Sequence, residues 1–337
     1  MQVLGARRYG DEVLAVEFRK PQDNGPKGAK AVAIVGCGLI GQAWATVFLR
    51  AGARVNLFDP VDGAAARAAE EIEKRLAELC AFGLAPKGAA EKGEGSLHVS
   101  PTLEEAVAEA DYIQENGPED LVIKTVLTQE IAHHAPSTAP VGSSTSGLPA
   151  SLYAETVEGR ERCLVVHPIN PPHLIPLVEV VPSKWTAQHV VDDVTRLLED
   201  VGQVPIVLAK EIDGFVVNRL QGALLKEAFR LLDNGIATSD TIDKAVSHGL
   251  GLRWSLMGPF ETIHLNAPGG VADYVQRFGP MYRKMFAAEQ HDTDWQMVVD
   301  AGLEADLTER CPLTDIARAQ KKRDTALMQL VASRKQA

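Results

Sequence analysis

A histidine and a glutamate twelve residues apart are the clearest candidates for acid–base chemistry in the sequence. His167 opens a proline-rich loop, and Glu179 follows within the apolar run PLVEVV. A carboxylate in such a strand is expected to be buried, and it then needs a partner because burying an unpaired charge is costly. Imidazole exchanges protons near neutral pH, so His167 could carry a proton while Glu179 fixes its tautomer. The spacing fits a catalytic pair and a structural pair equally well.

Small polar residues near two further predicted strands extend this candidate site. APVGSSTSG predicts a strand ending in hydroxyl residues, the last of which is Ser146, and CLVVHPINPP predicts a strand ending at His167 with Asn170 behind it. Because ligands bind at strand ends in open α/β sheets, these residues and Glu179 meet if the strand order places them together. Nucleophilic serine chemistry is the competing interpretation. It is weak because no GxSxG turn surrounds these serines.

A glycine-rich turn predicts a dinucleotide site. Gly36, Gly38 and Gly41 have GxGxxG spacing, directly after the apolar segment 31–35 and at the start of a predicted helix over 40–51. The first glycine permits a tight turn, the second lets the backbone approach a pyrophosphate, and the third lets helix pack on strand. Leu39 and Ile40 complete the candidate set, because the helix N-terminus attracts the phosphates. A glycine turn that serves packing alone is the alternative.

Asp59 determines which nicotinamide dinucleotide we expect. It ends the second predicted strand, 21 residues after Gly38, where a carboxylate can accept hydrogen bonds from the adenosine ribose hydroxyls. The same carboxylate would repel the 2′-phosphate of NADP, and no arginine follows to receive that phosphate, since Pro60 and Val61 come next. The sequence therefore predicts NAD as the cofactor.

Glu115 and Asn116 end another short predicted strand. Strand ends at the carboxyl edge of an open α/β sheet are where ligands lie, so Glu115 is a candidate to approach the nicotinamide side of the cofactor. A solvated turn is an equally good interpretation.

Composition and charge exclude several kinds of partner. The 337 residues carry a formal net charge of −11, which argues against nucleic acids and anionic membranes, since both require clustered Lys and Arg. No apolar run reaches the roughly 20 residues of a bilayer span, and no signal-peptide pattern opens the chain, so we expect a cytoplasmic protein with a small-molecule partner. The four cysteines lack CxxC or His/Cys ligand spacing, so we expect reduced thiols and no metal site.

Length and pattern predict an α/β protein with two domains. Residues 1–29 form a polar N-terminal extension to which we assign no chemistry. Residues 30–210 alternate strands and helices, as in a Rossmann-type doubly wound sheet domain. Residues 211–337 contain only helical patterns, among them an amphipathic helix over 215–233, and predict a smaller all-α C-terminal domain.

Five segments together resemble the L-3-hydroxyacyl-CoA dehydrogenase superfamily: GCGLIG, SSTSGLP, HPINPPHLIPLVEVV, EIDGFVVNRL and GLGLRWSLMGPFETIHLN. The resemblance runs in order from about residue 31 to residue 270 and keeps the interval of twelve residues between histidine and glutamate. Within the superfamily the chain is most similar to the lambda-crystallin and L-gulonate 3-dehydrogenase branch, with L-carnitine dehydrogenase a near neighbour.

The resemblance implies a role for each candidate residue. His167 would be the general base that takes the hydroxyl proton of an L-3-hydroxy substrate, while hydride leaves the same carbon for NAD. Glu179 would orient His167, and Asn170 would support it. Ser146 and Asn218 would hydrogen-bond the reacting oxygen, the alternatives being a helix-capping serine and an ordinary polar helix face.

Two features bear on the substrate. In the acyl-CoA enzymes of the superfamily, the helix after the ribose-binding aspartate supplies Lys and Ser, whereas here the predicted helix over 63–82 holds Arg67, Lys74 and Arg75 among four glutamates. Arg253 stands where the acyl-CoA branch carries no arginine, and a guanidinium is suited to a free carboxylate. The sequence therefore favours a small free acid of the L-gulonate or 3-hydroxybutyrate type. The alternative for Arg253 is a surface arginine paired with a helix acid.

Other outcomes remain open. L-Carnitine is one candidate substrate, and its trimethylammonium would require an aromatic cage, for which Trp254, Tyr153 and Phe260 are the obvious residues. An L-3-hydroxyacyl-CoA ester is another, and a non-catalytic, crystallin-like protein that binds NAD is a third. The resemblance also implies a homodimer formed through the C-terminal helical domain, although apolar helix faces can equally form a domain's own core.

Overall fold

The computed structural model describes residues 31–86, 96–287 and 293–334, and the chain divides into two compact units. Among the described residues, one unit contains 31–219 and 321–334, and the other contains 220–320. We name them the sheet unit and the helical unit and describe each by itself. The predicted extension over residues 1–29 lies outside the described residues.

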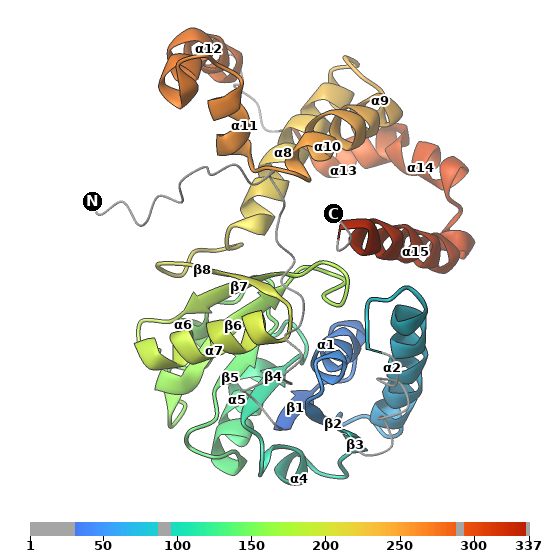
Figure 1. Cartoon of the computed structure of the whole chain (residues 1–337). Coiled ribbons are helices and arrows are strands. Elements are labelled where there is room, and N and C mark those ends of the chain that lie inside the picture. The colour runs from blue at the N-terminus through green and yellow to red at the C-terminus, as the bar shows by residue number, and fades with distance from the viewer. Residues whose placement is uncertain (1–30, 87–95, 288–292, 335–337) are drawn as a thin grey trace. The chain divides into compact units, whose positions relative to one another are not determined.

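An eight-stranded sheet forms the centre of the sheet unit, as Figure 1 shows. The strand order is β3-β2-β1-β4-β5-β6-β7-β8, and neighbouring strands are parallel except for the antiparallel pair β6 and β7. The order runs outward from β1 in both directions, as in a doubly wound α/β fold, which confirms the predicted fold class. The strands are β1 (Ala31–Val35), β2 (Arg54–Phe58), β3 (Leu97–Val99), β4 (Tyr112–Glu115), β5 (Val141–Ser143), β6 (Cys163–Pro168), β7 (Leu177–Pro182) and β8 (Val204–Val207).

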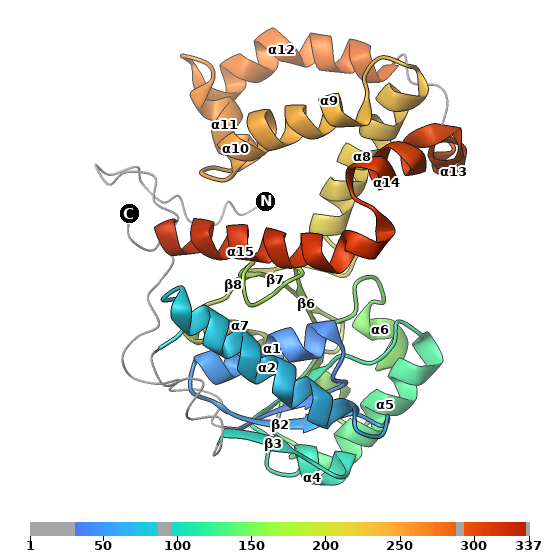
Figure 2. The same ribbon diagram turned by 90° about the vertical axis from the view of Figure 1, so that its right-hand side faces the viewer.

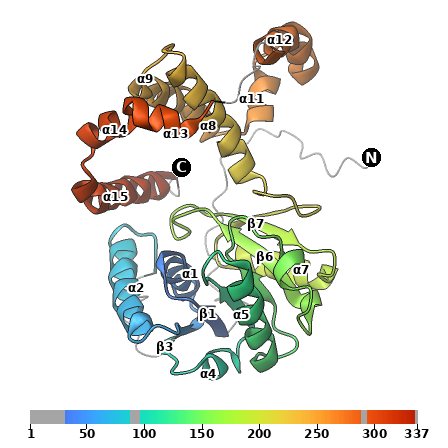
Figure 3. The same ribbon diagram turned by 180° about the vertical axis from the view of Figure 1, so that it is seen from behind.

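Helices cover both faces of this sheet. On one face α1 (Leu39–Arg50), α2 (Ala64–Ala81) and α7 (Gln188–Asp200) build one apolar core, as can be followed in Figure 2. On the other, α4 (Leu103–Val107), α5 (Leu121–His134) and α6 (Ala150–Tyr153) build a second, seen from behind in Figure 3. Strand β1 reads AVAIV and is buried throughout, because a central parallel strand is covered on both faces.

The last part of the chain returns to the sheet unit. Residues 321–334 belong to α15 (Ile316–Arg334), and Met328 shares a small apolar core with Leu79, Leu84 and Leu174. An ion pair of 3.4 Å between Lys321 Nζ and Glu78 Oε1 also joins this segment to α2. The C-terminal segment therefore covers part of the surface of α2.

In the helical unit, residues 220–287 and 293–320 form helices and their connections and no strand, which agrees with the predicted all-α character of the C-terminal part. Taken by itself it leaves many large apolar side chains exposed, and no residue of α8 is buried. Its elements are α8 (Val217–Asp233), α9 (Ser239–Lys244), η2 (Ala245–Leu250), α10 (Gly251–Trp254), α11 (Pro259–Leu265), α12 (Gly270–Ala287), α13 (Trp295–Val298), η3 (Val299–Leu303), α14 (Glu304–Arg310) and η4 (Leu313–Asp315), followed by the start of α15. Among the described helices of the whole chain, none is both long and apolar enough to cross a membrane.

Candidate active site

The two residues that the sequence singled out first are direct neighbours in the sheet. Strands β6 and β7 pair antiparallel, with His167 opposite Glu179. The Nδ1 atom of His167 lies 2.7 Å from Oε2 of Glu179, and both side chains are buried. A hydrogen bond to the carboxylate requires the proton on Nδ1, which leaves the other ring nitrogen, Nε2, as a proton acceptor.

The second carboxylate oxygen of Glu179 is held by the backbone that leads into α8. Oε1 accepts hydrogen bonds from the N–H groups of Val216 at 2.7 Å and Val217 at 3.0 Å. Burial opposes ionisation, but the hydrogen bonds from His167, Val217 and Val216 prevail and lower the pKa of Glu179 from its ordinary value. Glu179 is therefore a carboxylate at neutral pH, and it is anchored on both oxygens.

Phe215 completes the surroundings of His167 and was not predicted from the sequence. It is fully buried, with a φ of 47° that follows Gly214 at 72°. Its ring centroid lies 5.4 Å from that of His167. A non-glycine residue at positive φ is rare and persists where surrounding structure holds it. Here the turn places Phe215 beside the imidazole and the next two N–H groups on Glu179.

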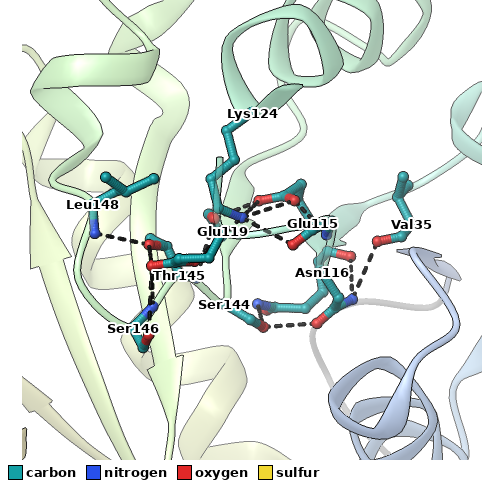
Figure 4. A network of polar contacts seen from close by, with 12 residues as sticks. Val35, Glu115, Asn116, Glu119, Lys124, Ser144, Thr145, Ser146 and Leu148 are labelled. Carbon is teal, nitrogen blue, oxygen red and sulfur yellow. Dashed lines mark hydrogen bonds and ion pairs between the residues drawn. The ribbon is translucent and has the colours of Figure 1, made fainter. Parts of the chain in front are cut away.

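Ser146 lies in a loop held by Glu119, as Figure 4 shows. Oε1 of Glu119 accepts hydrogen bonds from Thr145 Oγ1 at 2.6 Å, from Gly147 N at 3.0 Å and from Ser146 N at 3.1 Å. Asn218 Nδ2 donates to the backbone oxygen of Ser146 at 2.9 Å. The structure therefore brings Ser146 and Asn218 together. The hydrogen bond between them involves the backbone oxygen of Ser146 and not its hydroxyl group.

A buried ion pair lies behind this loop, and it corrects one interpretation of Glu115. Glu115 and Lys124 are almost fully buried, and Lys124 Nζ lies 3.0 Å from Oε2 and 3.1 Å from Oε1 of Glu115. The same carboxylate accepts hydrogen bonds from Ser143 Oγ and from Gly117 N. The interpretation of Glu115 as part of a solvated turn is therefore wrong, because its carboxylate is buried. Its approach to the nicotinamide stays a prediction.

Lys124 and Glu119 were missed in the sequence, although one signal was present. Lys124 interrupts the apolar run LVIKTVL of α5, and a charged residue in such a run needs a partner if the helix face is buried. The partner is Glu115, nine residues earlier on β4. Lys124 Nζ also lies 3.9 Å from Glu119 Oε2, so one lysine links the strand end to the serine loop.

The glycine turn has the shape that a dinucleotide requires. Gly36 has φ of 92°, and a Cβ on it would lie 2.7 Å from the carbonyl oxygen of Asn116. A Cβ on Gly41 would overlap the carbonyl oxygen of Gly36, so helix and strand pack directly there. Gly38 faces open space and is the N-cap of α1 without a side chain to cap it. The first N–H groups of α1, including those of Leu39 and Ile40, are therefore not capped by a side chain at this position.

Asp59 supports the turn from the end of β2. Its Oδ2 accepts a hydrogen bond of 2.7 Å from Cys37 N, and Oδ1 accepts one of 2.9 Å from Val61 N. Each oxygen retains a second lone pair for a ribose hydroxyl. Burial and the neighbouring Asp59 carboxylate raise the pKa of Cys37 to about 12, so this thiol stays protonated and unreactive.

Three further sequence candidates differ in their exposure and in their described contacts. Asn170 is exposed, and none of the hydrogen bonds among the described residues joins it to His167. Arg253 is an exposed residue of α10 in the helical unit, where the described residues give it no ion pair. Tyr153 is buried in the core of the sheet unit, so it is not available for an aromatic cage.

The comparisons with known proteins decide the family. The sequence model for the NAD binding domain of 3-hydroxyacyl-CoA dehydrogenase matches residues 31–212, and that for the C-terminal domain of the same enzyme matches residues 214–304. The chain belongs to the 3-hydroxyacyl-CoA dehydrogenase family. It is therefore an NAD-binding oxidoreductase, and NAD as the predicted cofactor is confirmed.

Individual relatives agree with this assignment. The chain is 38% identical to L-carnitine dehydrogenase of Oceanobacillus iheyensis, over 90% of this chain and 97% of that protein. It is 40% identical to the lambda-crystallin homolog of Homo sapiens, over 75% of this chain and 83% of that protein. Among solved structures it resembles 5-formyl-3-hydroxy-2-methylpyridine 4-carboxylic acid 5-dehydrogenase, an NAD⁺-dependent dismutase, with a TM-score of 0.77 and 26% identity over 89% of this chain and 97% of the other.

Proposed function

We propose that this member of the 3-hydroxyacyl-CoA dehydrogenase family oxidises the 3-hydroxyl group of a small L-3-hydroxy acid with a free carboxylate. The product is the 3-keto acid. NAD would accept the hydride. The cofactor would be held by the glycine turn, the start of α1 and Asp59. The observation that carries the proposal is the buried contact of 2.7 Å between His167 and Glu179.

His167 acts as the general base in this proposal. Its Nδ1–H donates to Glu179, so Nε2 takes the hydroxyl proton as hydride leaves the same carbon. The imidazolium that forms is stabilised by the adjacent carboxylate, whose own protonation is disfavoured by its lowered pKa. The anchoring of Glu179 by Val216 and Val217 keeps the carboxylate from turning away.

Ser146 and Asn218 are proposed to hydrogen-bond the reacting oxygen. Asn218 already binds the backbone of Ser146, and Glu119 fixes the same loop from the other side. A donor held in place before the reaction stabilises developing charge without reorganisation. Asn170 retains its proposed role as a support for His167.

The surface of α2 favours a free acid over a CoA ester. A CoA thioester carries phosphates that require exposed cations. On α2, Lys74 is exposed but paired with Glu71 at 2.7 Å, and the Nη1 atom of Arg75 is buried, so the exposed Arg67 is the one cation of this helix that is neither paired with a described residue nor partly buried. Residues 321–334 further cover the C-terminal part of this helix. Arg253 is the proposed partner of the substrate carboxylate, since a guanidinium forms bidentate pairs with carboxylates.

L-Carnitine is a second candidate, because a relative 38% identical to the chain is an L-carnitine dehydrogenase. It is itself a free L-3-hydroxy acid, so the same reaction applies. Trp254 and Phe260 are exposed in the helical unit that carries Arg253 and remain available to a trimethylammonium group. A relative named 3-hydroxyacyl-CoA dehydrogenase, 37% identical to the chain, keeps the CoA ester as an alternative to test.

The test is NADH formation, followed by absorbance, with L-gulonate, L-3-hydroxybutyrate, L-carnitine and L-3-hydroxybutyryl-CoA. We expect turnover of at least one free acid and loss of that turnover in His167→Ala. His189→Ala, an exposed histidine on α7, is the matched control and retains full activity. Turnover of the CoA ester alone would overturn the free-acid proposal, and NAD binding without turnover of any compound would favour a non-catalytic protein.

We further propose that the chain forms a homodimer through the helical unit. In α12, Val275, Met281 and Met285 are each about half exposed, and Leu220 of α8 is 63% exposed. Exposed apolar helix faces of this kind are suited to a second subunit. Size-exclusion chromatography with light scattering should give twice the mass of one chain, and Met281→Glu should lower it. Val122→Glu, an exposed apolar position of α5, is the control.

A further inference from the structure

Four basic residues from four segments of the sheet unit lie close enough to interact electrostatically. We name them the basic cluster: Arg50 at the end of α1, Arg75 of α2, His173 of the loop between β6 and β7, and Arg323 of α15. Leu174 follows His173 directly and shares an apolar core with Leu79 and Met328, which fixes the loop between α2 and the C-terminal segment.

Two members of this cluster have buried nitrogen atoms without a partner. Nη1 of Arg75 and Nδ1 of His173 are both inaccessible to solvent and make no hydrogen bond. His173 is 8% exposed. Buried donors are normally satisfied, because an unmade hydrogen bond costs the full desolvation of the group. Both atoms therefore retain hydrogen-bonding capacity that no described residue uses.

Arg50 forms no ion pair with a carboxylate among the described residues. Its Nη1 donates to the backbone oxygen of His173 at 3.0 Å. Burial lowers the pKa of Arg50 to about 10, which still leaves it charged at neutral pH. A partly buried guanidinium whose only described hydrogen-bond partner is a neutral carbonyl has no counter-charge of its own.

The nearby acids supply only part of the counter-charge for this cluster. The carboxylates that act on Arg75 are Glu71, Asp324 and Glu78. Glu71 is paired with Lys74 at 2.7 Å, Asp324 with Arg323 at 2.7 Å and Glu78 with Lys321 at 3.4 Å. Each acid thus has a cation of its own, and Arg50 and Arg75 remain in excess within a chain whose net charge is −11.

We propose that the basic cluster is a binding site for a small oxyanion, with Arg50 and Arg75 as its charged ligands and His173 Nδ1 as a neutral hydrogen-bond partner. Carboxylates and phosphate-like ions are the chemistry that guanidinium groups recognise. His173 is almost fully buried, which favours a small ion over a large cofactor. The source is either free inorganic phosphate or the carboxylate of the substrate. In the second case the cluster, and not Arg253, binds that carboxylate, and the experiment separates the two.

The test is calorimetric titration of the full-length protein with inorganic phosphate and with sulfate at pH 7, in chloride buffer of matched ionic strength. We expect saturable binding of one ion per chain. Arg75→Met should weaken it at least tenfold, whereas Arg67→Met, at an exposed arginine on the same helix, should bind like wild type. Arg75→Met should also melt close to wild type without anion, because Arg75 is partly buried and forms no ion pair among the described residues. Arg75→Gln, which also removes the charge but keeps hydrogen-bonding groups, serves the same purpose if Arg75→Met does not fold.

Absence of saturable binding of either ion to wild type would overturn the proposal, and so would equal binding by Arg75→Met. Competition with L-3-hydroxybutyrate then identifies the source of the oxyanion. Displacement of phosphate shows that the carboxylate of the acid occupies the cluster, and simultaneous binding shows a separate phosphate site. The measurement needs no turnover, so its failure leaves the proposed dehydrogenase activity untouched and an inactive enzyme leaves this proposal standing.

Discussion

Replacing Glu179 with glutamine should invert the tautomer of His167. In the structure Oε2 faces His167 Nδ1, while Oε1 accepts the N–H groups of Val216 and Val217. A glutamine amide has one oxygen and one NH₂ group, and backbone N–H groups can only donate. The amide oxygen therefore turns to the backbone, and the NH₂ group donates to Nδ1. The proton of the imidazole moves to Nε2, which can then no longer accept the hydroxyl proton.

The expected loss of activity follows from the free-energy cost of the other amide orientation, in which the NH₂ group faces the backbone N–H groups. That orientation would leave two backbone donors unsatisfied, at about 1–3 kcal/mol each, so roughly 2 kcal/mol is its minimum cost. A difference of about 2 kcal/mol corresponds to about 30-fold in population. We expect kcat/KM to fall by about 30-fold at least, and by up to about 10⁴-fold if the wrong tautomer is fully populated, as for amide replacements of histidine-orienting carboxylates.

The assay is kcat/KM for NADH formation with the best free acid, together with NAD affinity and urea unfolding. The free energy of unfolding should fall by only about 1–2 kcal/mol, because the backbone hydrogen bonds survive. Glu109→Gln, which loses only an exposed pair with Arg54, is the control. Glu179→Gln with kcat/KM within threefold of wild type and unchanged NAD affinity would refute the role given to Glu179.

Three further predictions follow from buried charges and from Asp59. Lys124→Met leaves Glu115 buried without its cation, so the free energy of unfolding measured in urea should fall by about 3–5 kcal/mol. A decrease of less than about 1 kcal/mol would contradict the buried ion pair. Burial, and then Arg75, Arg50 and Arg323, lower the pKa of His173 from 6.5 to about 3. As the pH falls, the unfolded chain therefore binds a proton at His173 before the folded chain does, and the free energy of unfolding should fall by about 2 kcal/mol between pH 6.5 and pH 5. His173→Asn should remove this pH dependence. Equal pH dependence in the variant and wild type would exclude the role of His173. Asp59→Ser should reduce the preference for NAD over NADP at least about tenfold in steady-state kinetics, since the repulsion of the 2′-phosphate is lost; an unchanged preference would exclude that role.

Local pattern was sufficient for the elements that position the cofactor. The apolar run 31–35 is strand β1 as predicted, and the predicted helix over 63–82 is α2, Ala64–Ala81. These assignments depend on periodicity and glycine spacing within about 20 residues of chain. The pairing of His167 with Glu179 could also be inferred, because the two strands that carry them are consecutive and a buried carboxylate demands a partner.

Contacts between distant segments could not be predicted in this way. The donors to the second oxygen of Glu179 come from Val216 and Val217, 37 and 38 residues later, and nothing local to Glu179 indicates them. Glu115 looked as much like a solvated turn as a site residue, because its burial depends on α5 lying against β4. The basic cluster draws on four segments between residues 50 and 323, so it exists only once the C-terminal segment has returned to α2.

The central claim is that hydride leaves C3 of a free L-3-hydroxy acid while His167 takes the hydroxyl proton. The most direct measurement uses L-3-hydroxybutyrate, or the best acid from the panel, deuterated at C3. Wild type should transfer the deuterium to NAD, detectable by mass spectrometry, and His167→Asn should bind NAD normally but lose at least about 10²-fold in rate. Reduced cofactor without deuterium, or a His167→Asn variant as active as wild type, would contradict the mechanism.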